Sequence, residues 1–168
     1  EDSVRPTIDD MRHGVVDDLV ARHIPEGAYP EQWDVPGLDE AVTRVLGLQL
    51  PVAEWAKEEG IADEEIRERI IQAADAKFAE KASSIGPETM RRVEKSLILQ
   101  MIDQGWRDHL AQLDMLRHGV NLRAYGQKQP LLEYQREAFQ MFNEMLEALR
   151  EKVTTILSRI EFRAEPAP

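Results

Sequence analysis

Histidines and carboxylates are the residues of this sequence that could perform acid–base or metal chemistry. The four histidines, His13, His23, His109 and His118, do not occur in a His-Glu-x-x-His pattern, in which two metal ligands share one helix face. We expect His109, beside an apolar helix face, to be a semi-buried, hydrogen-bonded histidine. Cysteine is absent, which excludes disulfides and thiolate metal sites and agrees with a reducing compartment. No metal site is expected.

The carboxylates and glycines point away from catalysis as well. The acidic pairs at residues 58–59 and 64–65 lie beside expected helix ends or on polar faces, where a solvated surface is the usual role. The glycines are scattered singly, and no Gly-x-x-x-x-Gly-Lys-Ser/Thr loop is present to hold nucleotide phosphates. We therefore expect this chain neither to bind nor to hydrolyse ATP, and to be a binding or scaffold module rather than an enzyme.

Charge is distributed unevenly along the chain. The whole formal net charge of −11 lies in residues 1–86, whereas residues 87–168 balance to zero. An acidic surface repels phosphate backbones, so nucleic acid is not an expected partner of the first half. The segment 115–132 contains no acidic residue and carries Arg117, Arg123 and Lys128, which makes it a local basic island.

The elements that position these residues are all predicted to be helices. Residues 1–24 form a helix that begins near Pro6 and ends before Pro25. Three further helices are predicted to open at Pro36, Pro51 and Asp63, the last as an N-cap. They are expected to form a small satellite domain in residues 25–86. Its core is predicted to gather Trp33, Leu50 and Trp55.

The second half predicts a long antiparallel helical hairpin. Its first helix runs from Pro87 to about His118, and a loop follows from Gly119 to Gln129. A second helix begins at Pro130 and carries a seam of apolar residues spaced four and three apart. With the first helix of the chain expected to pack on the hairpin as a third helix, the fold class is all-α. The predicted apolar positions of the hairpin are Met90, Val93, Leu97, Met101, Ile102, Trp106, Leu110 and Leu113, then Phe142, Leu146, Leu149, Val153, Ile156 and Ile160.

Long strings of this sequence resemble the family of SecA, the bacterial protein-export motor. Residues 31–38 (EQWDVPGL) and 50–55 (LPVAEW) resemble the family's helical wing. Residues 90–95 (MRRVEK) and 101–110 (MIDQGWRDHL) resemble the first helix of its two-helix finger. Residues 122–131 (LRAYGQKQPL) and 133–137 (EYQRE) resemble the fingertip and the second finger helix. The resemblance runs in the family's order from about residue 8 to residue 162.

The resemblance implies a domain organisation. Residues 1–24 would be the C-terminal part of the long scaffold helix, 25–86 the helical wing, and 87–163 the two-helix finger. Residues 164–168 are expected to be a disordered tail. The family threads unfolded preproteins through the SecYEG channel with ATP and Mg²⁺, which bind in nucleotide-binding domains that precede these segments. This chain would then be a scaffold and coupling module that regulates the ATPase, in the cytoplasm and peripheral at the inner membrane.

The resemblance also implies which residues touch the preprotein and its signal peptide. The expected contact sits at the fingertip, where the family carries a tyrosine at the position of Tyr125. Without the resemblance, Tyr125 either contacts a partner or folds back on Leu122 or Leu131. Arg123 and Lys128 either meet lipid head groups or an acidic channel rim, or keep the tip soluble. The remaining expected fingertip residues are Leu122, Gly126 and Gln127.

Three residues of the first finger helix have two interpretations. Trp106 is expected to pack in the core, because a large ring on an apolar helix face usually does. Arg107 and Asp108 either pair with neighbours in the hairpin or meet a nucleotide-binding domain, and all three are candidate interdomain contacts. Two other functions stay open: a self-contained helical adaptor or chaperone that binds unfolded peptide, and a coiled-coil arm that grips RNA, which requires a basic stripe along the hairpin.

Overall fold

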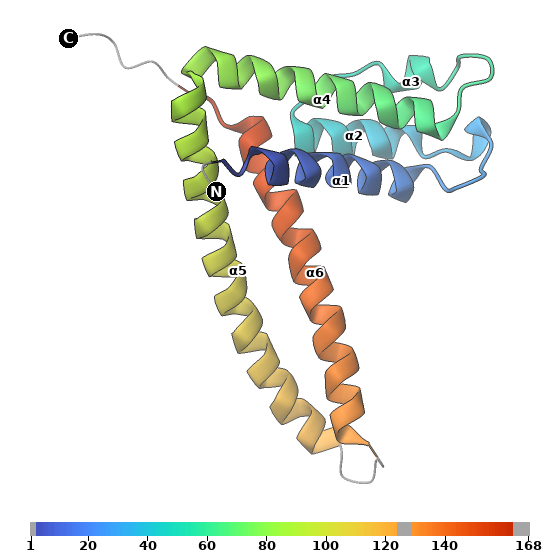
Figure 1. Ribbon diagram of the computed structural model, residues 1–168. Coiled ribbons are helices and arrows are strands. Elements are labelled where there is room, and N and C mark those ends of the chain that lie inside the picture. Colours follow the sequence, from blue (N-terminus) through green and yellow to red (C-terminus); the bar gives the residue numbers. More distant parts are fainter. Residues whose placement is uncertain (1–2, 124–128, 163–168) are drawn as a thin grey trace. The chain divides into compact units, whose positions relative to one another are not determined.

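The computed structural model describes residues 3–123 and 129–162, with the side chain of Arg123 outside the description. No strand occurs in these ranges, so the predicted all-α class is confirmed (Figure 1). In chain order the elements are α1 (Arg5–His23), the 3-10 helix η1 (Pro30–Gln32), α2 (Val35–Leu46), α3 (Val52–Trp55), α4 (Asp63–Ile85), α5 (Pro87–Arg123) and α6 (Pro130–Arg159).

The chain forms two compact units. Unit 1 comprises residues 1–95 and 150–168, and unit 2 comprises residues 96–149. Helices α5 and α6 each contribute to both units, because each is continuous across a boundary. We call the first turns of α5, residues 87–95, the root of the hairpin.

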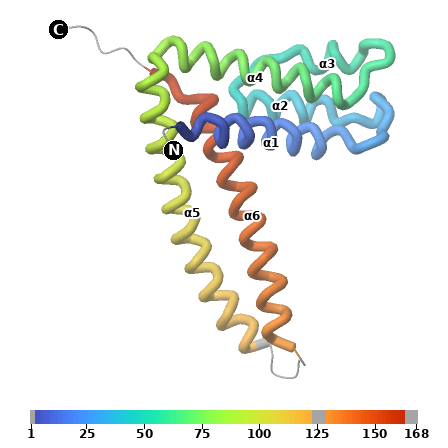
Figure 2. The backbone as a smooth tube through the Cα atoms, in the orientation of Figure 1, coloured from blue at the N-terminus to red at the C-terminus, as the bar shows by residue number. Residues whose placement is uncertain are grey.

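Unit 1 is built on one apolar core shared by α1, α2 and α4, which run alongside one another (Figure 2). Trp33 is 8% exposed in this core, as expected, and Leu50 and Trp55 pack against it partly buried. The predicted satellite is therefore not closed on itself, because α1 supplies part of its core. The buried residues of this core are Val15, Val16, Leu19, Val20, Ile24, Trp33, Leu38, Ala41, Val42, Val45, Leu46, Val52, Ile61, Ile66, Ile70 and Ala74.

Helix α1 packs mainly against α4 and α2, and Val15 and Leu19 belong to the core that it shares with them. Two ion pairs link it to the hairpin helices: Arg5 pairs with Glu94 of α5 at 2.6 Å, and Arg22 approaches Glu151 of α6 at 3.7 Å. This differs from a third helix lying along the hairpin, because the short helices offer apolar stripes that need a partner.

The junction between α1 and α2 is closed by one carboxylate. The backbone N–H of Gly37 donates to the Asp34 carboxylate at 3.1 Å, which caps α2, and His23 Nδ1 lies 3.0 Å from the same carboxylate. The His23 hydrogen bond and then the Gly37 hydrogen bond lower the pKa of Asp34 below its usual 3.8. The charged form of Asp34 is therefore the one that the fold uses.

Asp34→Asn is expected to lower stability at neutral pH, because the cap and the His23 contact are weakened. A folded-state pKa below the unfolded value contributes stability that is present above the unfolded pKa and lost as pH falls through the folded pKa. The difference between Asp34→Asn and the native chain should thus vanish at acidic pH, as measured by urea unfolding across pH. Asp39→Asn, at an exposed position of α2, is the control. A difference independent of pH would contradict the assigned role of the charge.

Unit 2 consists of the parts of α5 and α6 that run antiparallel. Gly105 faces Met145, and the rings of His109 and Phe142 are 5.7 Å apart. Residue numbers thus fall along α6 as they rise along α5, as antiparallel helices require. Helix α5 extends to Arg123, beyond the predicted end near His118, and the expected loop from Gly119 is shorter at its start. A single glycine costs a helix only about 1 kcal/mol, and the buried Val120 offsets that cost.

The buried face of α5 differs from the predicted one. In unit 2 it carries Ile98, His109, Leu116 and Val120, each at most 9% exposed. The predicted Ile102, Trp106 and Leu110 are instead 47%, 48% and 49% exposed. Of the predicted seam of α6, Phe142 is 36% exposed, whereas Val153 is fully buried within unit 1. Helix α5 has apolar residues on more than one face, and α6 covers one of them.

Candidate functional site

The predicted fingertip falls between the end of α5 and the start of α6. Leu122 lies in the last turn of α5 with 79% of its surface exposed. Arg123 ends that helix, and its side chain is not described. Tyr125, Gly126, Gln127 and Lys128 lie outside the described residues. Their roles stay predictions.

An aromatic cluster lies in the hairpin well away from the fingertip in sequence. The His109 ring contacts Trp106 at 5.6 Å and Phe142 at 5.7 Å between centroids. His109 is only 4% exposed, and its Nδ1 has no hydrogen-bond partner among the described residues. His109 is thus more buried than the expected semi-buried histidine, and it lies between two aromatic rings.

Exposed apolar side chains continue from this cluster along both helices. On α5 they are spaced three, four and four residues apart, which puts them on one helix face. Trp106 and Phe142 both contact His109, so the two helices contribute to the same region of the hairpin. We call this surface the apolar strip. It comprises Leu99, Ile102, Trp106 and Leu110 of α5 and Phe139 and Phe142 of α6.

The strip was missed from the sequence because most of its members were assigned to the core, namely Ile102, Trp106, Leu110 and Phe142. Leu99 was the available signal, since it lies outside the predicted seam and yet continues the line of Ile102 and Trp106. Leu99 is 68% exposed and Phe139 is 69% exposed. Exposed apolar side chains that gather on one helix face are candidates for an interaction surface.

Arg107 and Asp108 pair within their own helix. Arg107 Nη2 lies 3.0 Å from an oxygen of Asp103, and the side-chain amide of Gln104 donates to Asp108 at 3.1 Å. Arg107 and Asp108 directly follow Trp106 in the sequence, and both are exposed. The first of the two predicted interpretations, pairing with neighbours in the hairpin, is thus observed, and exposed pairs of this type contribute little stability.

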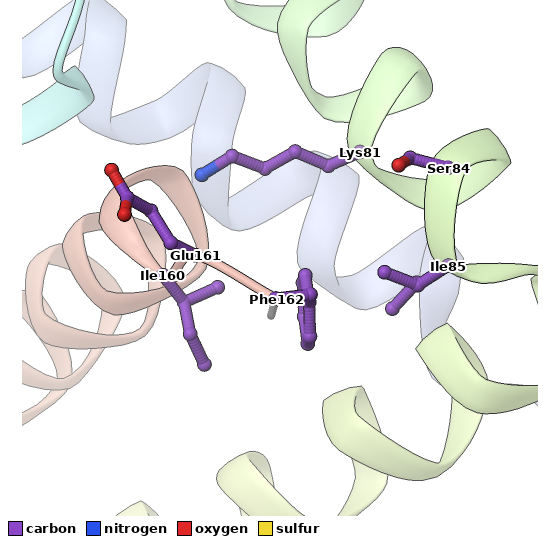
Figure 3. Close-up of a pocket in the computed structure, with 6 residues that line it drawn as sticks. All are labelled: Lys81, Ser84, Ile85, Ile160, Glu161 and Phe162. Atoms are coloured by element: carbon purple, nitrogen blue, oxygen red, sulfur yellow. The ribbon is translucent and has the colours of Figure 1, made fainter. Parts of the chain in front are cut away.

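A pocket lies in unit 1 beside the end of α6 (Figure 3). Lys81 of α4 reaches across it and donates to the carbonyl oxygens of Leu157 and Ser158. Burial, followed by the nearby charge of Lys77, lowers the pKa of Lys81. Because the ammonium group donates to these carbonyls, we interpret Lys81 as a residue that stabilises the C-terminal end of α6 rather than as a reactive amine. The pocket lining is Lys81, Ser84, Ile85, Ile160, Glu161 and Phe162.

Within residues 3–123 and 129–162, no three histidine or acidic side chains gather in a group that could hold a metal ion. Nor does any helix there combine the length and apolar content needed to cross a bilayer.

The described residues thus contain an all-helical unit and a two-helix hairpin that exposes an apolar strip. The comparisons supply the family. A family model of the SecA wing and scaffold domain matches residues 1–161, and the chain belongs to the SecA family. The match covers a wing and scaffold domain and not a nucleotide-binding domain, in agreement with the expectation that this chain is not itself an enzyme.

Similar proteins include translocase subunits of several bacteria. The chain is 56% identical over 161 residues to the protein translocase subunit SecA of Bradyrhizobium diazoefficiens, covering 96% of the chain and 17% of the relative. It is 55% identical over 169 residues to protein translocase subunit SecA 1 of Rhodopseudomonas palustris BisA53, covering 100% and 18%. The chain thus spans less than a fifth of these relatives. The predicted division at residues 24, 86 and 163 stays a prediction, since one match covers nearly all of it.

Proposed function

We propose that this chain is a non-catalytic scaffold and coupling module of a protein-export motor. In this proposal the fingertip at Tyr125 contacts preprotein and signal peptide within the SecYEG channel, and the module regulates the motor's ATPase. ATP and Mg²⁺ bind to other parts of the whole protein. The module works in the cytoplasm, peripheral to the inner membrane. The names of the relatives, translocase subunits, support a role in protein translocation.

The apolar strip is the observation that carries this proposal. A self-contained domain gains stability by burying such residues, whereas here Trp106, Leu110 and Phe139 remain between 48% and 69% exposed. The relatives extend over more than five times the length of this chain. We therefore propose that the rest of the motor covers the strip, with Trp106, Arg107 and Asp108 as interdomain contacts.

The rival function is a self-contained adaptor or chaperone that holds unfolded peptides on the same strip. Exposed apolar surface is compatible with it, and the two proposals differ in what the isolated chain does. As an adaptor, it binds unfolded peptide tightly without any other protein. As a motor module, it acts on the ATPase. An RNA-gripping arm requires a basic stripe, and the described hairpin places Asp103 and Asp108 next to Arg107 instead.

The test is to add this chain to a SecA protein from which the same segment has been deleted, and to measure its ATPase rate. We expect the chain to change the rate in a saturable manner, because it restores a regulatory contact. Trp106→Asp should weaken that effect at least about tenfold, since it places a charge in an apolar contact. Met115→Asp, at a 74% exposed position of α5 outside the strip, is the matched control. An unaltered ATPase rate together with tight binding of unfolded peptide would favour the adaptor.

A further inference from the structure

The root of the hairpin contains a fully buried carboxylate. Glu94 of α5 is 0% exposed, and its Oε1 accepts from Arg5 Nε at 2.8 Å and lies 2.6 Å from Arg5 Nη2. Its Oε2 has no partner among the described residues. Burial of an ionised carboxylate is costly unless a cation compensates it, and Arg5 is the one cation that the described ranges provide for Glu94.

Arg5 is itself held by an aromatic ring of α4. Its guanidinium carbon lies 4.8 Å from the ring centre of Phe78, and that of Arg12 lies 4.4 Å from the same ring. Phe78 is 5% exposed, and the Arg12 side chain is 6% exposed whereas Arg5 keeps 33%, so the Arg12 contact is the better shielded from solvent. The ring joins the two arginines of α1 to α4.

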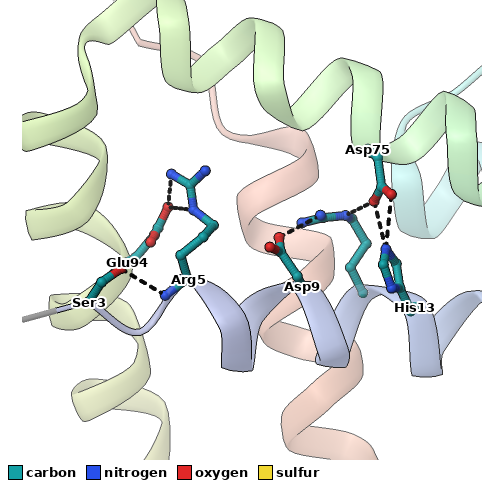
Figure 4. A network of polar contacts seen from close by, with 7 residues as sticks. Ser3, Arg5, Asp9, His13, Asp75 and Glu94 are labelled. Carbon is teal, nitrogen blue, oxygen red and sulfur yellow. Dashed lines mark hydrogen bonds and ion pairs between the residues drawn. The ribbon is translucent and has the colours of Figure 1, made fainter. Parts of the chain in front are cut away.

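Each of these guanidinium groups carries its own acidic counter-group (Figure 4). Arg12 is 5% exposed and pairs with Asp75 of α4 at 2.8 Å and with Asp9 at 2.6 Å, and His13 approaches Asp75 at 2.9 Å. The acidic partners of Arg12 thus lie in α1 and α4. Arg5 differs in that its acidic partner belongs to α5.

We propose that the Arg5–Glu94 pair is a latch that fastens the root of the hairpin to α1 and α4. Closed, the latch keeps the Glu94 charge compensated and the first turns of α5 attached to unit 1. Open, it leaves a buried charge without a partner, and the root must detach to hydrate it. Arg5 can open the latch because its side chain retains 33% exposure, whereas Glu94 has 1%. The latch is a property of this chain and does not depend on the proposed function.

The experiment is amide hydrogen exchange on the whole chain carrying Arg5→Gln. We expect protection of the root amides in residues 91–95 to fall at least about tenfold, because removal of one partner from a buried pair is strongly destabilising. Amides of α2 should keep their protection. Arg92→Gln is the matched control, since Arg92 forms an equivalent 2.8 Å pair with Glu88 on the same helix but is 79% exposed. Equal protection in both variants overturns the latch.

A second substitution distinguishes the effect of the uncompensated Glu94 charge from the effect of lost Arg5 packing. Adding Glu94→Gln to Arg5→Gln removes the uncompensated charge and should restore part of the root protection. A purely packing role for the Arg5 side chain predicts no such recovery, and no recovery overturns the proposal. If Arg5→Gln alone does not fold, the double variant decides: a folded double variant supports the latch, and an unfolded one overturns it.

Discussion

Trp33→Ala is expected to destabilise the chain by about 3–5 kcal/mol, the usual cost of deleting a buried tryptophan ring. Trp33 is 8% exposed in the core of unit 1, and its indole N–H donates to the carbonyl of Ala28 at 3.1 Å. The substitution removes both the packing and this hydrogen bond. Because small domains unfold at a total cost of about 5–15 kcal/mol, this loss is a large fraction of the stability. Urea unfolding followed by far-ultraviolet circular dichroism measures it.

Trp106→Ala is the matched comparison, since it removes the same ring from a half-exposed position. The sequence pattern assigned Trp106 to the core, but 48% of its surface is accessible. We therefore expect a loss of at most about 2 kcal/mol, in proportion to the smaller buried area. Equal losses for the two tryptophans would mean that the ring of Trp106 is packed in solution, and the apolar strip would lose its central member.

Helix starts were predictable because their signals are local. Pro87 and Pro130 open α5 and α6 as expected, and Pro6 lies in the first turn of α1. A proline at the first helical turn has no N–H to leave unsatisfied, so the signal needs no knowledge of the rest of the fold. Asp63 was one residue off, since it is the first residue of α4 and Ala62 occupies the cap position.

Helix partners were less predictable, because they depend on tertiary packing. The face of α5 that meets its neighbours includes the buried Glu94 and His109 and the half-buried Gly105, none of which a search for apolar periodicity selects. Each is explained only by a neighbour: Arg5 for Glu94, Met145 for Gly105, and two aromatic rings for His109. The more apolar line of Ile102 and Trp106 therefore appeared to be the core. The packing partners of α1 were hard to predict for the same reason, because they come from helices distant in the sequence.

The fingertip was assigned by resemblance rather than by physical pattern. A short polar connection with one tyrosine has no periodicity from which a contact can be derived. The structure describes the helices on either side, α5 up to Arg123 and α6 from Pro130, while Tyr125 lies outside the described residues. The preceding Leu122 is 79% exposed. An aromatic side chain in such a connection can contact a partner without disturbing a core.

Tyr125→Ala in the whole motor is expected to lower preprotein translocation at least about tenfold while changing basal ATPase activity little. An aromatic ring grips many polypeptide sequences by stacking and apolar contact, which suits a motor with varied substrates. Loss of the ring uncouples hydrolysis from movement, and the fold should persist because a connecting residue contributes little to a core. Translocation of a preprotein into membrane vesicles, measured beside ATPase activity, provides both rates.

Conservative substitutions at the same position identify the chemical group. Tyr125→Phe and Tyr125→Trp should retain most of the translocation activity, because the ring and not the hydroxyl makes the proposed contact. Gln129→Ala, four residues away at an exposed position, serves as the control for a change that removes no aromatic ring. Normal translocation by Tyr125→Ala refutes the grip. If the variant instead unfolds at a lower temperature and loses translocation and ATPase activity equally, Tyr125 is a packing residue. The polypeptide contact then lies elsewhere on the hairpin, and the exposed ring of Phe139 is the next residue to replace.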